Sequence, residues 1–303
     1  MDKLYSPTTT KKIIDKYGFR ISKSLGQNFL TDRNIVDNII RGAGIEKEDL
    51  VIEVGPGMGV LTAAAAEKAR RVIGIEIDEN LIPILRETLK EYDNVRIVRG
   101  DFLKMDLGAL IRETREGAAA GNPESFANVK FIGNLPYYIT SPIIMKVLEE
   151  HAKGMYDIQS LTVMIQKEVA DRIRAVPGTK AYGALSVAVQ YYCAVEMVAV
   201  VSKEVFVPKP KVDSAVLHLS IRKEPPVKLL DPAMFFAVVK AGFGQRRKTL
   251  LNSLTGLSGM DKQQIQSLLN RAGIDPARRA ETLTLHEFAV IANLVKAESE
   301  EKG

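Results

Sequence analysis

The sequence predicts an α/β protein with a mostly parallel sheet, followed by a smaller all-helical region. From residue 49 onward, short apolar strands alternate with helical segments, which is typical of a parallel sheet with helices on both faces. Beyond the proline-rich stretch at 223–232, only helical patterns follow. We therefore expect one domain over 1–224, with an N-terminal helical segment at 1–45, and a second, helical domain over 225–303.

The elements of the first domain follow from the spacing of apolar residues. Strands are expected at 49–55, 71–78, 94–101 and 129–134, with a strand running into a helix at 161–173. Helices are expected at 28–43, 60–69, 79–92, 141–150 and 182–193. Segment 196–221 is interpreted as two strands joined at a proline turn, a finish that usually adds an antiparallel strand. The small, polar residues at 112–128 predict a flexible surface loop.

Composition narrows the class of protein. The single cysteine, Cys193, allows no internal disulfide, which fits a reducing compartment. The three histidines lie far apart and give no metal-ligand spacing, so no metal site is expected. The N-terminus lacks the apolar core of a signal peptide, and no apolar run approaches the roughly 18 residues that span a bilayer. We expect a cytoplasmic protein without a membrane partner.

Basic residues concentrate in the C-terminal region. The chain has a net charge of +5, and eight Lys or Arg residues fall between Lys240 and Ala280. Within that span only Asp261 and Asp275 oppose them. A local excess of this kind suits a phosphate backbone, although a solvated basic face explains it equally well.

A glycine-rich turn follows the first expected strand. Gly55, Gly57 and Gly59 lie between this strand and the next helix, where glycine permits a tight turn and close approach of a ligand. Glu76 ends the second strand, where an acidic side chain accepts hydrogen bonds from ribose hydroxyls. The pattern predicts a nucleoside site. Its G-x-G-x-G spacing favours an adenosylmethionine enzyme over a nicotinamide dehydrogenase, because Val60 stands where the dehydrogenase pattern has glycine.

Two further polar residues follow successive strands of the predicted sheet. Asp101 comes directly after the third strand, and Asn134 ends the fourth. The carboxyl ends of parallel strands meet at the edge where such sheets bind ligands. Asp101 could accept a hydrogen bond from an adenine amine, although alone it would more often cap a turn. We expect both residues to lie beside Gly55 and Glu76.

The motifs in order resemble one enzyme family over roughly residues 20 to 290. They are SLGQNFL (24–30), EVGPGMGVLT (53–62), IEID (75–78), GDFL (100–103), NLPYYITSP (134–142), VFVPKPKVDSAV (205–216) and FGQRRKTLLNSL (243–254). Together they resemble the rRNA adenine dimethyltransferases, in particular the small-subunit (KsgA-type) branch that acts on 16S rRNA.

The resemblance implies a fold, a methyl donor and a set of site residues. The fold is a Rossmann-like class I methyltransferase sheet of seven strands with an antiparallel last strand, and a small helical C-terminal domain. The donor is S-adenosylmethionine. Its binding residues match Asn28, Leu30, Gly55, Glu76, Asp101 and Asn134, with Gly57 in the same turn. The implied substrate is a pair of adjacent adenosines near the 3′ end of small-subunit rRNA, within an assembling 30S particle.

The implied catalytic motif, Asn134, Leu135, Pro136 and Tyr137, also makes chemical sense from its residues. An adenine exocyclic amine is a poor nucleophile because its lone pair is delocalised into the ring. The Asn134 side-chain oxygen and a carbonyl from Leu135 or Pro136 could accept its two protons and favour a tetrahedral nitrogen. The Tyr137 ring could stack on the extruded base. For Tyr138 the sequence gives no role beyond packing against the sheet rim.

Several basic residues are candidates for RNA contacts. Arg246, Arg247 and Lys248 are expected to open a helix of the C-terminal domain, and Lys209 and Lys211 lie in the proline turn. Arg20 and Lys23, near the N-terminus, fit phosphate contacts as well. Nothing in the sequence indicates more than a monomer.

Three alternatives remain. An Erm-type large-subunit rRNA methyltransferase would share the catalytic domain, although the 205–216 and 243–254 segments fit the small-subunit branch better. A DNA adenine methyltransferase usually has a larger recognition region and an acidic residue in place of Asn134. A ribosome-assembly factor could keep the fold without catalysis, but the intact glycine turn and NLPY motif argue against a purely binding role.

Overall fold

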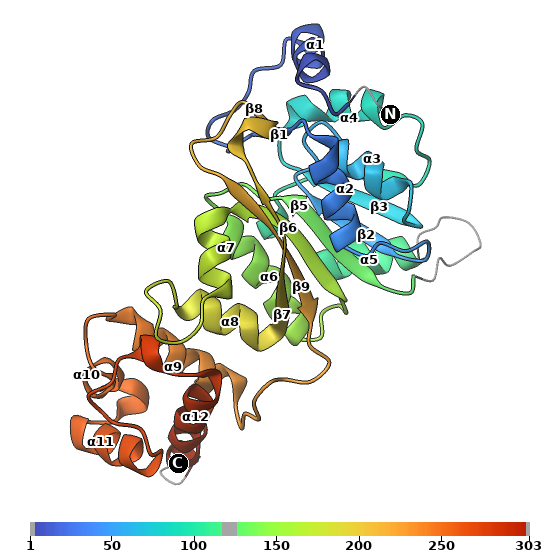
Figure 1. Cartoon of the computed structure of the whole chain (residues 1–303). Coiled ribbons are helices and arrows are strands. Elements are labelled where there is room, and N and C mark those ends of the chain that lie inside the picture. Colours follow the sequence, from blue (N-terminus) through green and yellow to red (C-terminus); the bar gives the residue numbers. More distant parts are fainter. Residues whose placement is uncertain (1–3, 117–125, 301–303) are drawn as a thin grey trace. The chain divides into compact units, whose positions relative to one another are not determined.

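The computed structural model describes residues 4–116 and 126–300 of the chain (Figure 1). Within them, seven strands form one sheet in the order β4-β3-β2-β5-β6-β9-β7. The strands are β2 (Leu50–Val54), β3 (Arg71–Glu76), β4 (Val95–Arg99), β5 (Val129–Asn134), β6 (Ser160–Gln166), β7 (Cys193–Val201) and β9 (Ser214–Ile221). Strands β2 to β6 pair in parallel, and β9 pairs antiparallel with β6. The predicted α/β class and the antiparallel last strand are confirmed.

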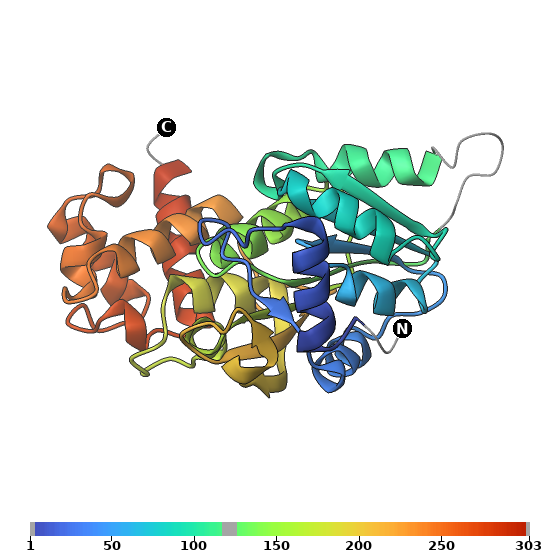
Figure 2. The same ribbon diagram turned by 90° about the horizontal axis from the view of Figure 1, so that it is seen from above.

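Helices cover both faces of this sheet. The helices before β7 are α1 (Pro7–Tyr17), α2 (Arg33–Gly42), α3 (Val60–Ala66), α4 (Ile82–Thr88), α5 (Leu107–Glu116), α6 (Thr140–Ala152), α7 (Lys167–Arg174) and α8 (Ala184–Tyr192), of which α8 belongs to the helical second unit described below. On one face, α2 and α3 pack over Val51, Val72 and Ile132, which lie side by side on neighbouring strands. On the other, the Phe131 ring contacts Phe102 and Tyr156. Viewed from above, α2 and α5 lie on opposite sides of the strands (Figure 2).

Two local predictions were wrong. Residues 28–30 were expected to begin a helix, but Phe29–Leu30 form the short strand β1, which pairs with β8 (Phe206–Val207). Residues 112–116 were expected in a loop, but they complete α5, whose buried face includes Leu110, Ile111 and Thr114. The remainder of that expected loop, 117–125, lies outside the described residues.

The chain divides into two compact units. The first comprises Met1–Ala170 and Val195–Ile221, and the second comprises Asp171–Ala194 and Arg222–Gly303. The chain leaves the first unit for the last time between Ile221 and Arg222, close to the boundary expected at residue 225. The sequence analysis placed residues 171–194 in the first domain, whereas they cluster with the second unit.

The second unit is helical and has its own apolar core. Besides α8 it contains α9 (Pro232–Gly244), α10 (Leu250–Leu254), α11 (Lys262–Arg271) and α12 (Leu285–Glu300). We call Asp171–Ala194 the inserted segment. In the core of the second unit, its residues Tyr182 and Val187 pack with Phe235, Leu268 and Phe288. Burying such side chains away from water is what stabilises a unit of this size.

Candidate active site

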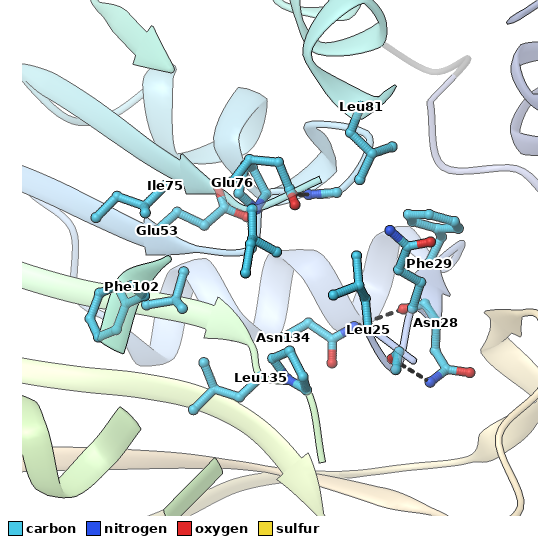
Figure 3. A pocket seen from close by; sticks show the side chains of 18 of the residues that line it. Leu25, Asn28, Phe29, Glu53, Ile75, Glu76, Leu81, Phe102, Asn134 and Leu135 are labelled. Carbon is cyan, nitrogen blue, oxygen red and sulfur yellow. Dashed lines mark hydrogen bonds between the residues drawn. The ribbon is translucent and has the colours of Figure 1, made fainter. Parts of the chain in front are cut away.

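A pocket at the carboxyl ends of the parallel strands brings the predicted donor and catalytic residues together (Figure 3). Its lining includes the predicted donor residues Asn28, Leu30, Gly55, Gly57, Glu76, Asp101 and Asn134 and the predicted catalytic residues Leu135, Pro136 and Tyr137. These residues span more than 100 positions of sequence, and all lie in the first unit. The parallel register explains the convergence, because β2, β3 and β5 end at the same edge.

The glycine turn after β2 has a backbone that other residues rarely adopt. Gly55, Gly57 and Gly59 have φ values of 69°, 60° and 86°. A side chain at Gly57 would meet the Phe29 ring at 3.2 Å, whereas one at Gly55 would project into open space. The turn therefore leaves bare backbone beside the pocket at Gly55, where a ligand can approach closely.

The Glu76 carboxylate is buried at the end of β3 and oriented by main-chain N–H groups. Gly57 N donates to one oxygen at 3.2 Å, and Asp78 N donates to the other at 2.9 Å. Burial raises the pKa of Glu76, while these two hydrogen bonds act in the opposite direction. A carboxylate has about four acceptor positions, so capacity remains for the hydroxyls of a ribose.

Glu53 is a pocket residue that was not predicted from the sequence, although it lies only two residues before Gly55. It lies within β2 and is only 1% exposed. Thr62 Oγ1 donates a hydrogen bond to it at 2.6 Å. Burial raises the pKa of this carboxyl group to about 8, and the nearby Glu76 adds to the rise. Glu53 is therefore mostly protonated at neutral pH.

Asp101 caps a turn and also lines the pocket. One oxygen caps the short 3₁₀ turn Phe102–Lys104 by accepting from Leu103 N at 3.0 Å. The other lies 3.5 Å from Lys104 Nζ. The side chain also lines the pocket and remains partly exposed there. It can accept a hydrogen bond from a ligand without losing the cap.

Asn134 is held by the segment that precedes β1. Its Nδ2 donates to the Asn28 carbonyl at 2.9 Å, and Asn28 Nδ2 in turn donates to the Gly26 carbonyl at 3.0 Å (Figure 3). These bonds use the donor side of the Asn134 amide. They leave its Oδ1 oxygen to accept a hydrogen bond in the pocket.

The two candidate carbonyls of the NLPY motif differ in their partners. The Pro136 carbonyl accepts from Ile139 N at 3.2 Å and from Thr140 Oγ1 at 3.1 Å, which stabilise the turn into α6. Among the described residues, no hydrogen bond reaches the Leu135 carbonyl. The Leu135 N–H donates to the Met164 carbonyl at 3.0 Å, so the backbone of Leu135 is anchored to β6. The Leu135 carbonyl is the better candidate for a second acceptor.

The Tyr137 side chain is fixed at its hydroxyl group. That hydroxyl lies 2.8 Å from the hydroxyl of Ser214, the first residue of β9. Ser214 is fully buried, and it pairs in register with Gln166 at the end of β6. Burial raises the pKa of Tyr137, so its hydroxyl stays protonated. The ring is thereby held in one orientation beside Asn134.

The basic residues of the second unit are arranged differently from the expectation. Arg246, Arg247 and Lys248 do not open a helix, because they lie in the turn between α9 and α10. Arg246 donates to the carbonyls of Lys180 and Tyr182, and its guanidinium lies 3.5 Å from Glu281. Arg246 therefore anchors the inserted segment Asp171–Ala194, although its side chain is half exposed, and Arg247 and Lys248 are exposed as well.

Acidic partners from outside the basic stretch neutralise two more of its charges. Arg271 pairs with Glu298, and Arg278 pairs with Glu287. In the proline turn of the first unit, Lys209 pairs with Glu204, and Lys211 is exposed. Such exposed pairs contribute only about 0–1 kcal/mol, so Lys209 can exchange its partner for a phosphate.

The described residues lack two features that are typical of other classes of protein. Within residues 4–116 and 126–300, no three His, Cys, Asp or Glu side chains gather in a way that could hold a metal ion. In the same part of the chain, no helix is both long and apolar enough to cross a membrane.

The seven-stranded sheet with its antiparallel strand, the glycine turn and the amide-bearing turn after β5 define the chain as a class I methyltransferase. The family model described as "Ribosomal RNA adenine dimethylase" matches residues 18–297. The chain belongs to this family.

Three known proteins show how far the similarity extends. "Ribosomal RNA small subunit methyltransferase A" of Clostridioides difficile (strain 630) is 49% identical over 302 residues, which cover 100% of both chains. The crystal structure of a dimethyladenosine transferase from Plasmodium falciparum shares the fold, with a TM-score of 0.71 and 24% identity over 90% of this chain and 98% of that one. The 23S rRNA methyltransferase ErmE gives a TM-score of 0.63 and 29% identity, with 89% and 100% covered.

Proposed function

We propose that this protein transfers methyl groups from S-adenosylmethionine to the exocyclic N6 amine of adenosines in small-subunit rRNA. One observation carries the chemical part of this proposal. The Asn134 amide donates to the Asn28 carbonyl, so its oxygen remains as an acceptor beside the nucleoside pocket. A tethered acceptor at this place suits an amine substrate.

The pocket residues fit a bound S-adenosylmethionine. Glu76 offers a buried, oriented carboxylate to ribose hydroxyls, and Gly55 leaves space for close approach. Asp101 offers an oxygen at the rim to an adenine amine. When bound, the donor supplies a methyl group on a sulfonium, which is already activated. The protein therefore needs to position and desolvate the two reactants rather than to activate the methyl group.

The NLPY turn prepares the adenine amine. The Asn134 oxygen and the Leu135 carbonyl accept its two N–H groups, which draws the nitrogen toward tetrahedral geometry and frees its lone pair. The proton lost after transfer leaves through these acceptors to solvent. The Tyr137 ring, held by Ser214, stacks on the extruded base. Two rounds on the same nitrogen give the dimethylated product.

The finer assignment concerns the target and its context. We propose two adjacent adenosines near the 3′ end of 16S rRNA, modified by a cytoplasmic monomer on a 30S assembly intermediate. The helical second unit would recognise RNA through Arg247 and Lys248, and Lys211 would add a contact from the first unit. Their exposure and positive charge support this role.

The similarity to ErmE keeps a large-subunit target as the alternative. The greater identity to the small-subunit relative, 49% against 29%, favours the small subunit. A non-catalytic assembly factor is disfavoured because the tethered Asn134 and the buried Glu76 serve a reaction rather than simple RNA binding.

Labelled methyl transfer onto undermethylated small and large subunits, measured in parallel and followed by mapping of the modified bases, tests the proposal. We expect label on adenosines of the small subunit only, and its incorporation about 10²- to 10³-fold slower with Asn134→Ala. Label on the large subunit would support the Erm-type alternative. Binding to small subunits without any label would support an assembly factor.

A further inference from the structure

Tyr138 is an aromatic side chain that the catalytic arrangement leaves unused. The sequence favoured packing against the sheet rim, but the residue is 57% exposed. It lines the mouth of the pocket, and its ring lies against the backbone of Gly26. A methyl group at Gly26 would contact ring atoms Cδ1 and Cε1 at 3.5 Å. The ring is therefore supported at Gly26, and more than half of the residue faces solvent.

The two adjacent tyrosines are directed to different elements. Tyr137 reaches β9 through the Ser214 hydroxyl, whereas Tyr138 lies against the turn that precedes β1. Among the described residues, the Tyr138 hydroxyl makes no hydrogen bond. Neither burial nor a polar contact thus explains an aromatic ring at this place. Exposed aromatic rings beside a groove are the usual stacking platforms for bases of single-stranded nucleic acid.

A positive charge lies in the same turn as the support for this ring. Gly26 N donates to the Lys23 carbonyl at 3.1 Å, which closes the turn, and the Lys23 side chain is exposed. Gln27 fixes the turn, since its amide donates to Asp78 at 2.7 Å and accepts from Ser22 N at 2.7 Å. The anchored turn thus carries an ammonium group that can bind a phosphate, and through Gly26 it supports the Tyr138 ring, which belongs to the turn after β5.

We propose that Tyr138 and Lys23 form a binding site for the nucleotide next to the extruded adenosine. The Tyr138 ring stacks on the neighbouring base, and Lys23 binds its phosphate. This inference rests on the proposed function, because it assumes that one adenine already occupies the pocket beside Tyr137. The neighbour is covalently joined to that adenosine and must leave its own stack when the strand is opened.

The site would also influence the course of the reaction. A purine stacks over a larger area than a pyrimidine, so Tyr138 favours targets with an adjacent purine. With two adjacent adenosines, the base of the second stacks on Tyr138 while the first is methylated beside Tyr137. Loss of the ring should therefore weaken RNA binding and reduce dimethylation of the second adenosine more than that of the first.

A protein–RNA mutant cycle tests the proposed contact. The full-length protein and Tyr138→Ala are each assayed on RNA that carries the target adenosine, with the neighbouring nucleotide either intact or abasic, on the 5′ side and on the 3′ side in turn. With intact RNA, we expect the KM of Tyr138→Ala to rise about 5- to 150-fold, the range of one lost base stack. The abasic nucleotide should raise the KM of the wild type similarly, and should add little in Tyr138→Ala.

Matched variants separate stacking from other effects. Tyr138→Phe keeps the ring and should bind RNA like the wild type. Val200→Ala removes an equally exposed apolar side chain, also 57%, from the edge strand β7, and should change nothing. Lys23→Gln should reduce the slope of log affinity against log salt by about 0.7, as for one phosphate contact on a single strand.

The outcomes distinguish this inference from the proposed function. If the abasic nucleotide weakens the wild type and Tyr138→Ala by the same factor on both sides, the proposed stacking is overturned. An unchanged KM in Tyr138→Ala would overturn it as well. If instead the wild type methylates no adenosine in any RNA or in undermethylated small subunits, the proposed function fails, and this inference fails with it.

Discussion

The hydroxyl groups of Tyr137 and Ser214 lie 2.8 Å apart and join the turn after β5 to the first residue of β9. Ser214 is buried and belongs to the sheet, so it gives the Tyr137 ring a rigid support. The orientation of the Tyr137 ring at the pocket thus depends on a strand that contributes no residue to the pocket lining.

The first prediction concerns the hydrogen bond between the Tyr137 and Ser214 hydroxyl groups. Ser214→Ala and Tyr137→Phe should each lower kcat by about 5-fold, the effect of one neutral hydrogen bond of about 1 kcal/mol. The double variant should be no slower than either single one, because both changes remove the same bond. Donor affinity, measured by calorimetry, should stay unchanged. Additive losses in the double variant would show that the two hydroxyls act separately.

The second prediction concerns the orientation of Asn134. Asn134→Ala should lower the rate of methyl transfer by about 10²- to 10³-fold, as for loss of one oriented group in a transition state. Asn134→Asp should also be impaired, because a carboxylate cannot donate to the Asn28 carbonyl that holds the amide. Single-turnover rates with saturating donor measure both effects. Full activity in Asn134→Ala would remove this residue from the mechanism.

The third prediction concerns donor binding at Glu76. Glu76→Ala removes the acceptor for the ribose and leaves Gly57 N and Asp78 N without their partner. We expect donor affinity to fall about 10- to 100-fold, since charged hydrogen bonds contribute about 1.5–3 kcal/mol. Glu76→Gln should lose less, because an amide oxygen still accepts. Equal affinity in wild type and Glu76→Ala, measured by calorimetry, would exclude Glu76 from the site.

The fourth prediction concerns the pH dependence of stability at Glu53. Burial raises its pKa from 4.5 to about 8 in the folded protein. Between these values the unfolded chain releases a proton that the folded chain retains, so the contribution of Glu53 to stability falls as pH rises through this window. The contribution of Glu53 to stability is constant well below pH 4.5 and well above about pH 8.

Glu53→Gln removes this dependence while keeping an acceptor for Thr62. The difference in unfolding free energy between variant and wild type should grow in favour of the variant by up to about 1.4 kcal/mol per pH unit across the window. Urea denaturation from pH 5 to 9 measures it. Parallel pH profiles for the two proteins would contradict the raised pKa.

The fifth prediction separates two adjacent arginines. Arg246→Ala should destabilise the protein by about 0.5–1.5 kcal/mol, because it removes hydrogen bonds to the Lys180 and Tyr182 carbonyls that water can only partly replace at this half-exposed position. Arg247→Ala should change stability by less than about 0.5 kcal/mol, as for a surface substitution.

For RNA binding, we expect the larger effect at Arg247 and Lys248 rather than at Arg246. Arg247→Ala combined with Lys248→Ala should weaken RNA affinity and flatten its salt dependence, by about 0.7 to 0.9 in slope for each lost phosphate contact. Thermal unfolding and filter binding across a range of salt concentrations measure the two effects. An unchanged salt slope would show that Arg247 and Lys248 do not contact phosphate.

Much of the site was predictable because it lies at the ends of strands. Strands β2, β3 and β5 have mostly apolar sequences, and parallel pairing brings Gly55, Glu76 and Asn134 to one edge. The local sequence indicates where each strand ends, and the general rules of α/β topology predict that the ends of these parallel strands meet at one edge of the sheet.

What escaped prediction depends on partners that are distant in sequence. Ser214 lies 77 positions from Tyr137, and nothing near it distinguishes it from any residue that begins a strand. The two-residue strand β1 exists through its pairing with Phe206–Val207. The anchoring function of Arg246 depends on the carbonyls of a segment that enters the unit from elsewhere in the chain.

The course of the chain between its two compact units limits how the protein can be divided. A fragment that begins at residue 225 would lack Asp171–Ala194, and with it Tyr182, Val187 and Tyr191 of the helical core. The complementary fragment would carry those side chains without their partners Phe235 and Phe288. A single cut therefore divides the helical core between the two fragments and leaves the core of the first unit complete, so exchange of the helical unit between relatives requires two spliced segments rather than one.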